Sequence, residues 1–359
     1  MNGLPPTERA LLRLCRLRPG AADRARIRTL GERVDWGALS RLAQRGGVAG
    51  LVARNLEGLG APRQMRLALT HAALLGQART QPLLDEGQRL CAAACAEGLT
   101  LVPLKGTALH LIDVYEPGLR TQCDLDLLAP REELEALDGL LRRAGWQEDA
   151  EHRSYALRHQ HHLTYWRDGQ RMLLELHWTG LLAQFSDRAV ERALLARCVT
   201  RQVRGQPLRL LATSDLCFLV ILHFCFHRFR AQLKWLVDIA ELARAGGAEL
   251  RWDEVYGLAR RVGALRATTL AVELARELLD APIPPPPRRP RLLPALARLA
   301  PALALVRSEP QPSLRERALI DLLAYDSPLH GARFLGRKAV ELLERRGLRL
   351  PLTPRARVS

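Results

Sequence analysis

The chain has 359 residues, of which 48% are hydrophobic, and a formal net charge of +16 at pH 7. That length and apolar content exclude wholesale disorder and a single small domain, and they predict about two or three packed units. The charge suggests a nucleic-acid partner. However, only three of the 54 basic residues are lysines, and the arginines are spread along the chain rather than gathered in one block. Such an excess of arginine over lysine is typical of proteins from GC-rich genomes. A polyanionic partner is therefore compatible with the charge but not established by it.

The sequence favours a soluble protein of a reducing compartment. No apolar run is long enough to cross a bilayer. The amino terminus, MNGLPPTERALLRLCRL, lacks the basic-then-apolar order of a signal peptide. The seven cysteines are odd in number and form no CxxC pair, which favours buried free thiols over disulfides or a zinc site. We therefore expect no membrane association and a cytoplasmic location.

The first part of the chain is predicted to be helical. From Pro62 to Ala96 apolar residues recur at helical spacing, and Pro82 marks a place where the helix would kink. At Gly98 the pattern changes, and segments typical of strands and helices begin to alternate. They are LTLVPL (strand, 99–104), KGTALHLIDVY (helix, 105–115), CDLDLLA (strand, 123–129) and PREELEALDGLLRRAGW (helix, 130–146).

A hairpin completes this alternating unit. HHLTYW and RMLLELHW are β-like runs joined around Asp168-Gly169, a dipeptide typical of tight hairpin turns. Beyond Leu181 the chain is mainly helical, apart from a second hairpin, CVTRQVRGQPLRLL, expected to turn at Gly205-Gln206. The predicted helices are Ser214–Arg230, Gln232–Arg244, Trp252–Val262 and Ala264–Leu279.

These patterns predict an α+β protein with a small mixed-sheet core between two helical parts. The proline run of APIPPPPRRPRLLP excludes a helix there and predicts an extended linker. The expected divisions are an N-terminal helical region (1–97), the core (98–180), a helical domain (181–280), a Pro-rich linker (281–294) and C-terminal helices with a tail (295–359).

Two aspartates stand one residue apart in the apolar stretch RTQCDLDLLAP. Residues two apart in a strand share a face, so Asp124 and Asp126 are expected to project together. Cys123, Leu125 and Leu127 are then expected to face a core. The two carboxylates repel each other, and a divalent cation such as Mg²⁺ would offset that repulsion. The alternative is an edge strand whose aspartates simply face solvent.

A third acid favours the metal interpretation. Glu175 lies between two leucines in RMLLELHW. If this strand lies beside the aspartate strand, three carboxylates converge and can hold two metal ions about 4 Å apart for in-line nucleotidyl displacement.

The turn PLKGTAL lies between a predicted strand and a predicted helix. Gly106 would let a phosphate approach the first amides of that helix, Thr107 would cap the helix or touch a phosphate oxygen, and Lys105 would add a point charge. An ordinary tight turn with a capping threonine is the alternative. Arg120 is either a solvated loop arginine or a clamp on phosphates or on the aspartate pair.

These residues together resemble a bacterial nucleotidyltransferase-like family of the DNA polymerase beta superfamily. The resemblance covers about residues 65–245. It rests on a Lys-Gly turn, an arginine before an Asp-x-Asp strand, an acid-x-His-Trp strand, a His-rich helix and a Lys-Trp-Leu-x-Asp helix. The matching positions are Lys105, Gly106, Arg120, Asp124, Asp126, Glu175, His177, Trp178, His223, His227, Lys234, Trp235 and Asp238.

The resemblance implies an enzyme that moves a nucleoside monophosphate from an NTP to a hydroxyl acceptor. Asp124 and Asp126 would ligate two Mg²⁺ ions, and Glu175 would complete the metal site. The NTP phosphates would be held by Lys105, Gly106, Thr107, Arg120 and Lys234. The sequence departs from the superfamily in carrying Gly-Thr where Gly-Ser is usual, and Cys123 where a smaller residue is common.

Several other residues have simpler interpretations. His223 and His227 share a helical face without a third ligand in sequence, so packing or an acceptor-site role is favoured over metal. His161 and His162 begin a strand and are expected to point to opposite faces. Lys234 has a specific ammonium role, or else pairs with an acid one turn later, Asp238.

The acceptor, the base preference and the oligomeric state are not specified by the sequence. RNA, a protein or a small molecule would each fit as acceptor. The alternative function is a non-catalytic nucleotide-binding or RNA-binding protein that retains the fold; the intact acid trio favours the enzyme.

Overall fold

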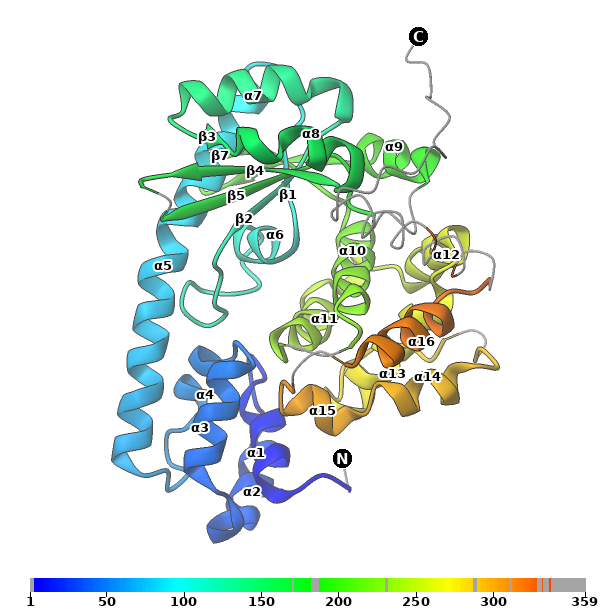
Figure 1. Ribbon diagram of the computed structural model, residues 1–359. Coiled ribbons are helices and arrows are strands. Elements are labelled where there is room, and N and C mark those ends of the chain that lie inside the picture. Colours follow the sequence, from blue (N-terminus) through cyan, green and yellow to red (C-terminus); the bar gives the residue numbers. More distant parts are fainter. Residues whose placement is uncertain are drawn as a thin grey trace.

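The structure is a computed structural model (Figure 1), and it describes most of the chain. The described residues are 3–169, 171–181, 187–229, 232–286, 289–309 and 312–327, together with Gly331 and Gly336. The predicted tail lies outside them.

A mixed five-stranded sheet has the strand order β1-β2-β5-β4-β3. β2 and β5 pair in parallel, and the other neighbours are antiparallel. The expected mixed-sheet α+β core is therefore confirmed. The strands are β1 (Val102–Pro103), β2 (Leu125–Leu128), β3 (Gln147–Glu148), β4 (His162–Arg167) and β5 (Met172–His177).

Helices cover both sides of this sheet. In Figure 1, α7 and α8 lie above it and α6 lies below it, beside β1 and β2. The long helix α5 runs from the sheet to the N-terminal helices. These helices are α5 (Arg63–Ala96), α6 (Lys105–Leu111), α7 (Leu134–Arg143) and α8 (Ala150–His159).

The rest of the described chain is helical apart from one hairpin. The N-terminal helices lie below the sheet, and the C-terminal helices lie beside them (Figure 1). They are α1 (Pro6–Leu14), α2 (Ala21–Leu30), α3 (Trp36–Arg45), α4 (Ala49–Asn55), α9 (Arg188–Ala196), the hairpin β6 (Val199–Val203) and β7 (Gln206–Leu210), α10 (Thr213–Phe226), α11 (Lys234–Ala245), α12 (Trp252–Val262), α13 (Leu265–Leu279), α14 (Leu293–Leu299), α15 (Ala302–Val306) and α16 (Leu314–Ala324).

The buried apolar side chains form two clusters. One lies around the sheet, and the other joins the N-terminal helices to the C-terminal helices. Helix α5 has 34 residues and contributes to both, through Met65 and Leu69 to the helical cluster and through Leu83 and Leu90 to the sheet cluster. At 1.5 Å per residue it is about 50 Å long, enough to connect the two.

Both predicted hairpins are confirmed. Asp168 and Gly169 have positive φ angles of 54° and 62°, the geometry expected of an Asp-Gly hairpin turn. The second hairpin turns at Arg204-Gly205, which also have positive φ, one residue earlier than predicted.

Several element bounds differ from the prediction. The strand at 99–104 is only two residues long, because the chain enters α6 directly at Lys105. Helix α5 continues through Pro82, and α10 ends at Phe226. Cys123 is exposed, not buried, because β2 begins only at Leu125 and the alternation of a strand does not reach back to it.

All seven cysteines are free. Within the described residues, no helix is both long and apolar enough to cross a bilayer.

Candidate active site

The parallel pairing of β2 with β5 brings two of the predicted acids together. Asp126 is the register partner of Glu175 on the neighbouring strand. Leu125 and Leu127, on the opposite face of β2, are fully buried in the sheet cluster. Asp124 lies in a bend just before β2 and is half-buried. The predicted convergence of strands is confirmed for Asp126 and Glu175.

Asp126 carries two nitrogen partners in this structure. The Lys105 ammonium donates to its Oδ1 at 2.6 Å, and His177 Nε2 lies 2.9 Å from the same oxygen. Burial alone would raise the pKa of Asp126, but Lys105 and His177 together hold it well below its ordinary range. Asp126 is therefore ionised at neutral pH.

The other two acids respond differently to the same surroundings. Burial, then the charges of Asp126 and Glu175, raise the pKa of Asp124 to about 6. Burial opposes ionisation of Glu175 too, but His177 Nε2, 3.3 Å from its Oε2, lowers the pKa of that carboxyl. Of the three acids, Asp124 is thus the one whose ionisation its surroundings disfavour. A cation bound nearby would stabilise its ionised form.

The Lys-Gly turn is shaped by an arginine. A Cβ on Gly106 would lie 2.1 Å from Nη1 of Arg120, so only glycine fits beneath that guanidinium. Lys105 has a φ of 48°, which directs the chain from β1 into α6. Thr107 does not cap α6: it is fully buried, and its hydroxyl accepts from Gln122 Nε2 at 2.6 Å and from the amide of Asp126 at 3.3 Å. Thr107 therefore fixes the start of β2.

Arg120 is 5% exposed and bound to helix α11. Its guanidinium makes three hydrogen bonds of 2.8–3.0 Å to the carboxylate of Asp238. Asp238 is thus the partner of Arg120, and the expected pairing with Lys234 is not formed. The Lys234 ammonium donates instead to the carbonyl of Thr121 at 3.2 Å. Burial, then Arg120, lowers the pKa of Lys234 to about 8.

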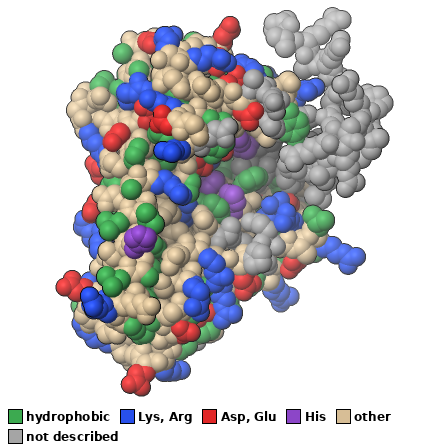
Figure 2. All heavy atoms as spheres, turned by 60° about the vertical axis from the view of Figure 1, so that its left-hand side comes forward, with side chains coloured by type: hydrophobic (Ala, Val, Ile, Leu, Met, Phe, Trp, Pro, Cys, Tyr) green, Lys and Arg blue, Asp and Glu red, His purple; other side chains and the backbone are tan. Residues whose placement is uncertain are grey.

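Three histidines gather beside the carboxylates. The rings of His161 and His162 lie 5.4 Å and 5.1 Å from that of His177, and 5.0 Å from each other. The prediction that His161 and His162 point to opposite faces is therefore wrong. β4 begins only at His162, so the alternation of a strand does not govern His161. Figure 2 shows histidine side chains gathered where this face is hollowed.

His223 and His227 form an aromatic group with Trp235. The rings of His227 and Trp235 are stacked at 3.9 Å, and His223 meets the same tryptophan edge-on at 5.0 Å. Burial, then Lys105, lowers the pKa of both histidines, to about 4 for His227. Neither belongs to a group of three or more described residues that could hold a metal ion.

Two groups of described side chains could hold a metal ion, and both contain His177. One is Asp126, Glu175 and His177; the other is His161, His162 and His177. Within each group all the ligand atoms lie within 4.8 Å of one another. Asp124 belongs to neither, although the charges of both other acids act on it. The carboxylates fit a hard divalent cation, provided that Lys105 and His177 leave Asp126 free to bind it.

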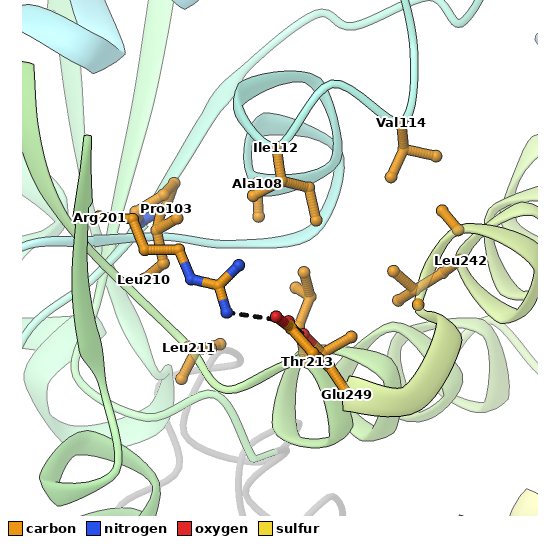
Figure 3. A pocket seen from close by; sticks show the side chains of 13 residues that line it. Pro103, Ala108, Ile112, Val114, Arg201, Leu210, Leu211, Thr213, Leu242 and Glu249 are labelled. Carbon is orange, nitrogen blue, oxygen red and sulfur yellow. Dashed lines mark hydrogen bonds and ion pairs between the residues drawn. The ribbon is translucent and has the colours of Figure 1, made fainter. Parts of the chain in front are cut away.

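A cavity of about 340 Å³ lies elsewhere, between α6, the β6–β7 hairpin and the helices α10 and α11 (Figure 3). Apolar side chains such as Ala108, Ile112 and Leu242 line it, and the Arg201–Glu249 ion pair of 2.8 Å lies across it. None of the predicted site residues lines it. We therefore place the chemistry at the carboxylates and not in this cavity.

A family model described as an uncharacterised nucleotidyltransferase matches residues 32–280, well over half of the chain. The chain belongs to this nucleotidyltransferase family. It is accordingly a transferase enzyme that acts in nucleotidyl transfer, and the resemblance to a nucleotidyltransferase family seen in the sequence is confirmed. The matched range contains all of the predicted site residues.

Other comparisons add little. No curated protein matches this nucleotidyltransferase. The structure of ANT(2")-Ia in complex with adenylyl-2"-tobramycin is 16% identical, with a TM-score of 0.35, over 50% of this chain and 95% of its own. An antigenic nucleotidyltransferase-like protein from Paracoccidioides brasiliensis is 17% identical, with a TM-score of 0.35, over 56% and 93%. Likeness at this level says nothing about the substrate.

Sequence reasoning missed three contributors to the site of this nucleotidyltransferase. Gln122 joins Thr107 to the carbonyl of Asp124, His177 contacts two of the acids, and His161 completes the imidazole group. The acid-x-His pattern of β5 placed His177 in the family motif but gave it no role. Because Glu175 and His177 are two residues apart on one strand, their shared face was the available signal.

Proposed function

We propose that this nucleotidyltransferase moves a nucleoside monophosphate from an NTP to a hydroxyl acceptor, with Mg²⁺ as cofactor. The observation that carries the proposal is the register of β2 and β5, which sets Glu175 beside Asp126. Asp124 precedes Asp126 by two residues in the chain. Buried acids on neighbouring strands are costly unless a cation balances them.

Asp124, Asp126 and Glu175 would hold the cofactor, two ions being expected. When bound, such ions stabilise the charge that develops on the oxygens of a transferring phosphoryl group. The raised pKa of Asp124 supports this assignment: burial and the charges of Asp126 and Glu175 outweigh the charges of Lys105 and Lys234, and a bound cation would offset that excess.

The cationic residues around the acids would position the triphosphate. The ammonium of Lys105 lies at the acids, and that of Lys234 is held beside the carbonyl of Thr121. Arg120 and Thr107 are buried, so we assign them to the nucleotide site as supports: Arg120 against Gly106, and Thr107 under Asp126. An α-phosphate held in line with the acceptor hydroxyl would be attacked with loss of pyrophosphate.

Glu175 is the carboxylate best suited to the acceptor. Its lowered pKa keeps it ionised at pH 7, and its side chain is 24% exposed against 7% for Asp126. An ionised, accessible carboxylate beside the hydroxyl accepts its proton as the new bond forms. The net charge of +16 favours an anionic acceptor such as RNA over a neutral one, with protein and small-molecule acceptors as the other classes.

The proposal includes the predicted divisions of the chain and a cytoplasmic location. The core at 98–180 would supply the carboxylates, and the helical domain at 181–280 would supply Lys234 and the aromatic group. Seven free cysteines fit a reducing compartment.

Calorimetric titration of each NTP, with and without Mg²⁺, tests the proposal. We expect Mg²⁺-dependent binding of at least one NTP, weakened at least tenfold by Asp124→Asn. Asp168→Asn is the matched control, because this aspartate lies in an exposed turn of the same sheet and asparagine tolerates its positive φ.

Two outcomes would contradict the proposal. One is the absence of Mg²⁺-dependent NTP binding. The other is salt-sensitive RNA binding that needs neither Mg²⁺ nor Asp124, which would indicate a nucleic-acid-binding protein.

A further inference from the structure

Three imidazoles converge at one end of the β4–β5 pair. His162 and His177 are direct register partners across the two antiparallel strands, so their side chains leave the same face. His161 precedes the strand, and its carbonyl accepts from the amide of Trp178, the residue after His177. That hydrogen bond holds the backbone of His161 beside the end of β5, next to His177.

The spacing of the three rings is close to that of a metal centre. One nitrogen from each ring lies within 4.8 Å of the other two. Nitrogens bound at 2.0–2.1 Å to one tetrahedral ion stand about 3.3 Å apart, so each ring needs to move inward by only about 1 Å.

A second observation also indicates a ligand. Nδ1 of His162 is buried and has no hydrogen-bond partner among the described residues, a costly state for a ring nitrogen. The other nitrogen of this ring, Nε2, lies 3.7 Å from Glu175 Oε1. His177 in turn directs Nε2 to Asp126 at 2.9 Å. Carboxylates that orient imidazoles through one nitrogen are the usual second neighbours of histidine-bound metals.

We propose that His161, His162 and His177 form a binding site for one first-row transition metal ion, of the class of Zn²⁺ or Co²⁺, at the edge of the carboxylate site. Three neutral nitrogen ligands suit such ions and not Mg²⁺, which requires oxygen. The ammonium of Lys105, a positive charge that acts on His161 and His162, is paired with Asp126 at 2.6 Å. This site does not depend on the proposed nucleotide chemistry.

Sharing of His177 gives the site a defined relation to the acids. A metal ion on Nδ1 of His177 would make the opposite ring nitrogen, Nε2, a stronger donor to Asp126 and Glu175, which it contacts in this structure. Occupancy of the imidazole site and the charge balance of the acids would therefore be coupled.

Metal titration of the full chain tests the proposal, with Co²⁺ as the visible probe and Zn²⁺ as competitor. We expect one Co²⁺ per chain with a nitrogen-ligand spectrum free of thiolate charge-transfer bands, displaced by Zn²⁺. His161→Gln and His162→Gln should each weaken binding at least tenfold. Both residues are half-buried, and thermal unfolding checks that the variants fold. His71→Gln, an exposed histidine of α5, is the matched control.

Several outcomes would overturn the proposed metal site. Unchanged Zn²⁺ affinity in both histidine variants, or a thiolate spectrum, overturns the proposal. So does Zn²⁺ binding that Glu175→Gln abolishes while His161→Gln leaves it intact, because the ion would then sit on the acids. Asp124→Asn should lose Mg²⁺-dependent NTP binding but keep Zn²⁺, which separates failure of this site from failure of the nucleotide site.

Discussion

At the scale of single residues, the ionised carboxylate of Asp124 opposes folding. Its pKa is raised from 3.8 to about 6 by burial and by the neighbouring acids, so its ionised form is less stable in the native state than in the unfolded chain. The stability present below about pH 4 is therefore lost as the pH rises through about 6. Asp124→Asn should remove this loss.

We predict that Asp124→Asn raises the free energy of unfolding at pH 7 by about 1–2 kcal/mol while it weakens nucleotide binding. Urea unfolding of both proteins between pH 4 and pH 8 checks this. The two curves should converge at low pH. An equal or lower stability of the variant at pH 7 would show that the carboxylate already has a cationic partner in the free protein.

The sequence predicted part of the site at this scale. Asp126 and Glu175 could be placed together because each is an acid between two leucines in a strand. This pattern indicates a strand with one apolar face and one face that carries the acid. Cys123 and His161 were misplaced for one shared reason: each lies just outside its strand, where two-residue alternation no longer applies. Arg120 could not be assigned to Asp238, because 118 residues separate them.

At the scale of elements, two helical glycines show how space decides the effect of a methyl group. A Cβ on Gly50 of α4 would lie 1.9 Å from the carbonyl oxygen of Gly118, which is backbone and cannot easily move. A Cβ on Gly257 of α12 meets nothing within 4 Å.

We predict opposite signs for the same substitution at these two positions. Gly50→Ala should lower the free energy of unfolding by about 2–3 kcal/mol through overpacking. Gly257→Ala should raise it by about 0.5–1 kcal/mol, because alanine loses less backbone entropy in a helix. Chemical denaturation of both variants measures this. A destabilised Gly257→Ala would indicate a neighbour that the structure does not place there.

The Arg120–Asp238 pair ties the loop before β2 to α11. Arg120→Met should cost about 3–5 kcal/mol because it leaves Asp238 buried without its partner, whereas Arg120→Met with Asp238→Leu should recover about 2 kcal/mol of that loss. A double-mutant cycle in urea gives the coupling. Additive single effects would show that the two groups do not stabilise each other.

Local signals decided which elements could be predicted. The Asp168-Gly169 dipeptide predicted the first hairpin correctly, because both residue types accept the positive φ that its turn requires. Helix α8 went unpredicted because AEHRSYALRH carries only a short and weak apolar stripe. β1 was overestimated because an apolar run does not show how many of its residues find a partner strand.

At the scale of the whole molecule, the residues that the family model matches are fewer than those that pack into the helical core. The match begins at residue 32 and ends at residue 280. Yet α1 lies before it with Leu11, Leu12 and Leu14 fully buried in the helical cluster. Arg307, beyond the match, binds Glu8 at 2.7 Å. The two ends of the described chain therefore complete one core.

We predict that a shortened chain of residues 32–280 does not unfold cooperatively. Loss of the three buried leucines alone removes about 6 kcal/mol, comparable to the whole stability of many domains. Calorimetric melting of the shortened and full chains tests this. A sharp transition at the full chain's temperature would show that the matched region folds unaided.

The Lys105–Asp126 contact gives the site its own internal counter-ion. A cation that binds Oδ1 of Asp126 displaces that ammonium, so its affinity measures an exchange and not a simple association. Phosphates that accept the released ammonium make the exchange more favourable. Cation and nucleotide would then bind cooperatively, each raising the affinity of the other by the same factor.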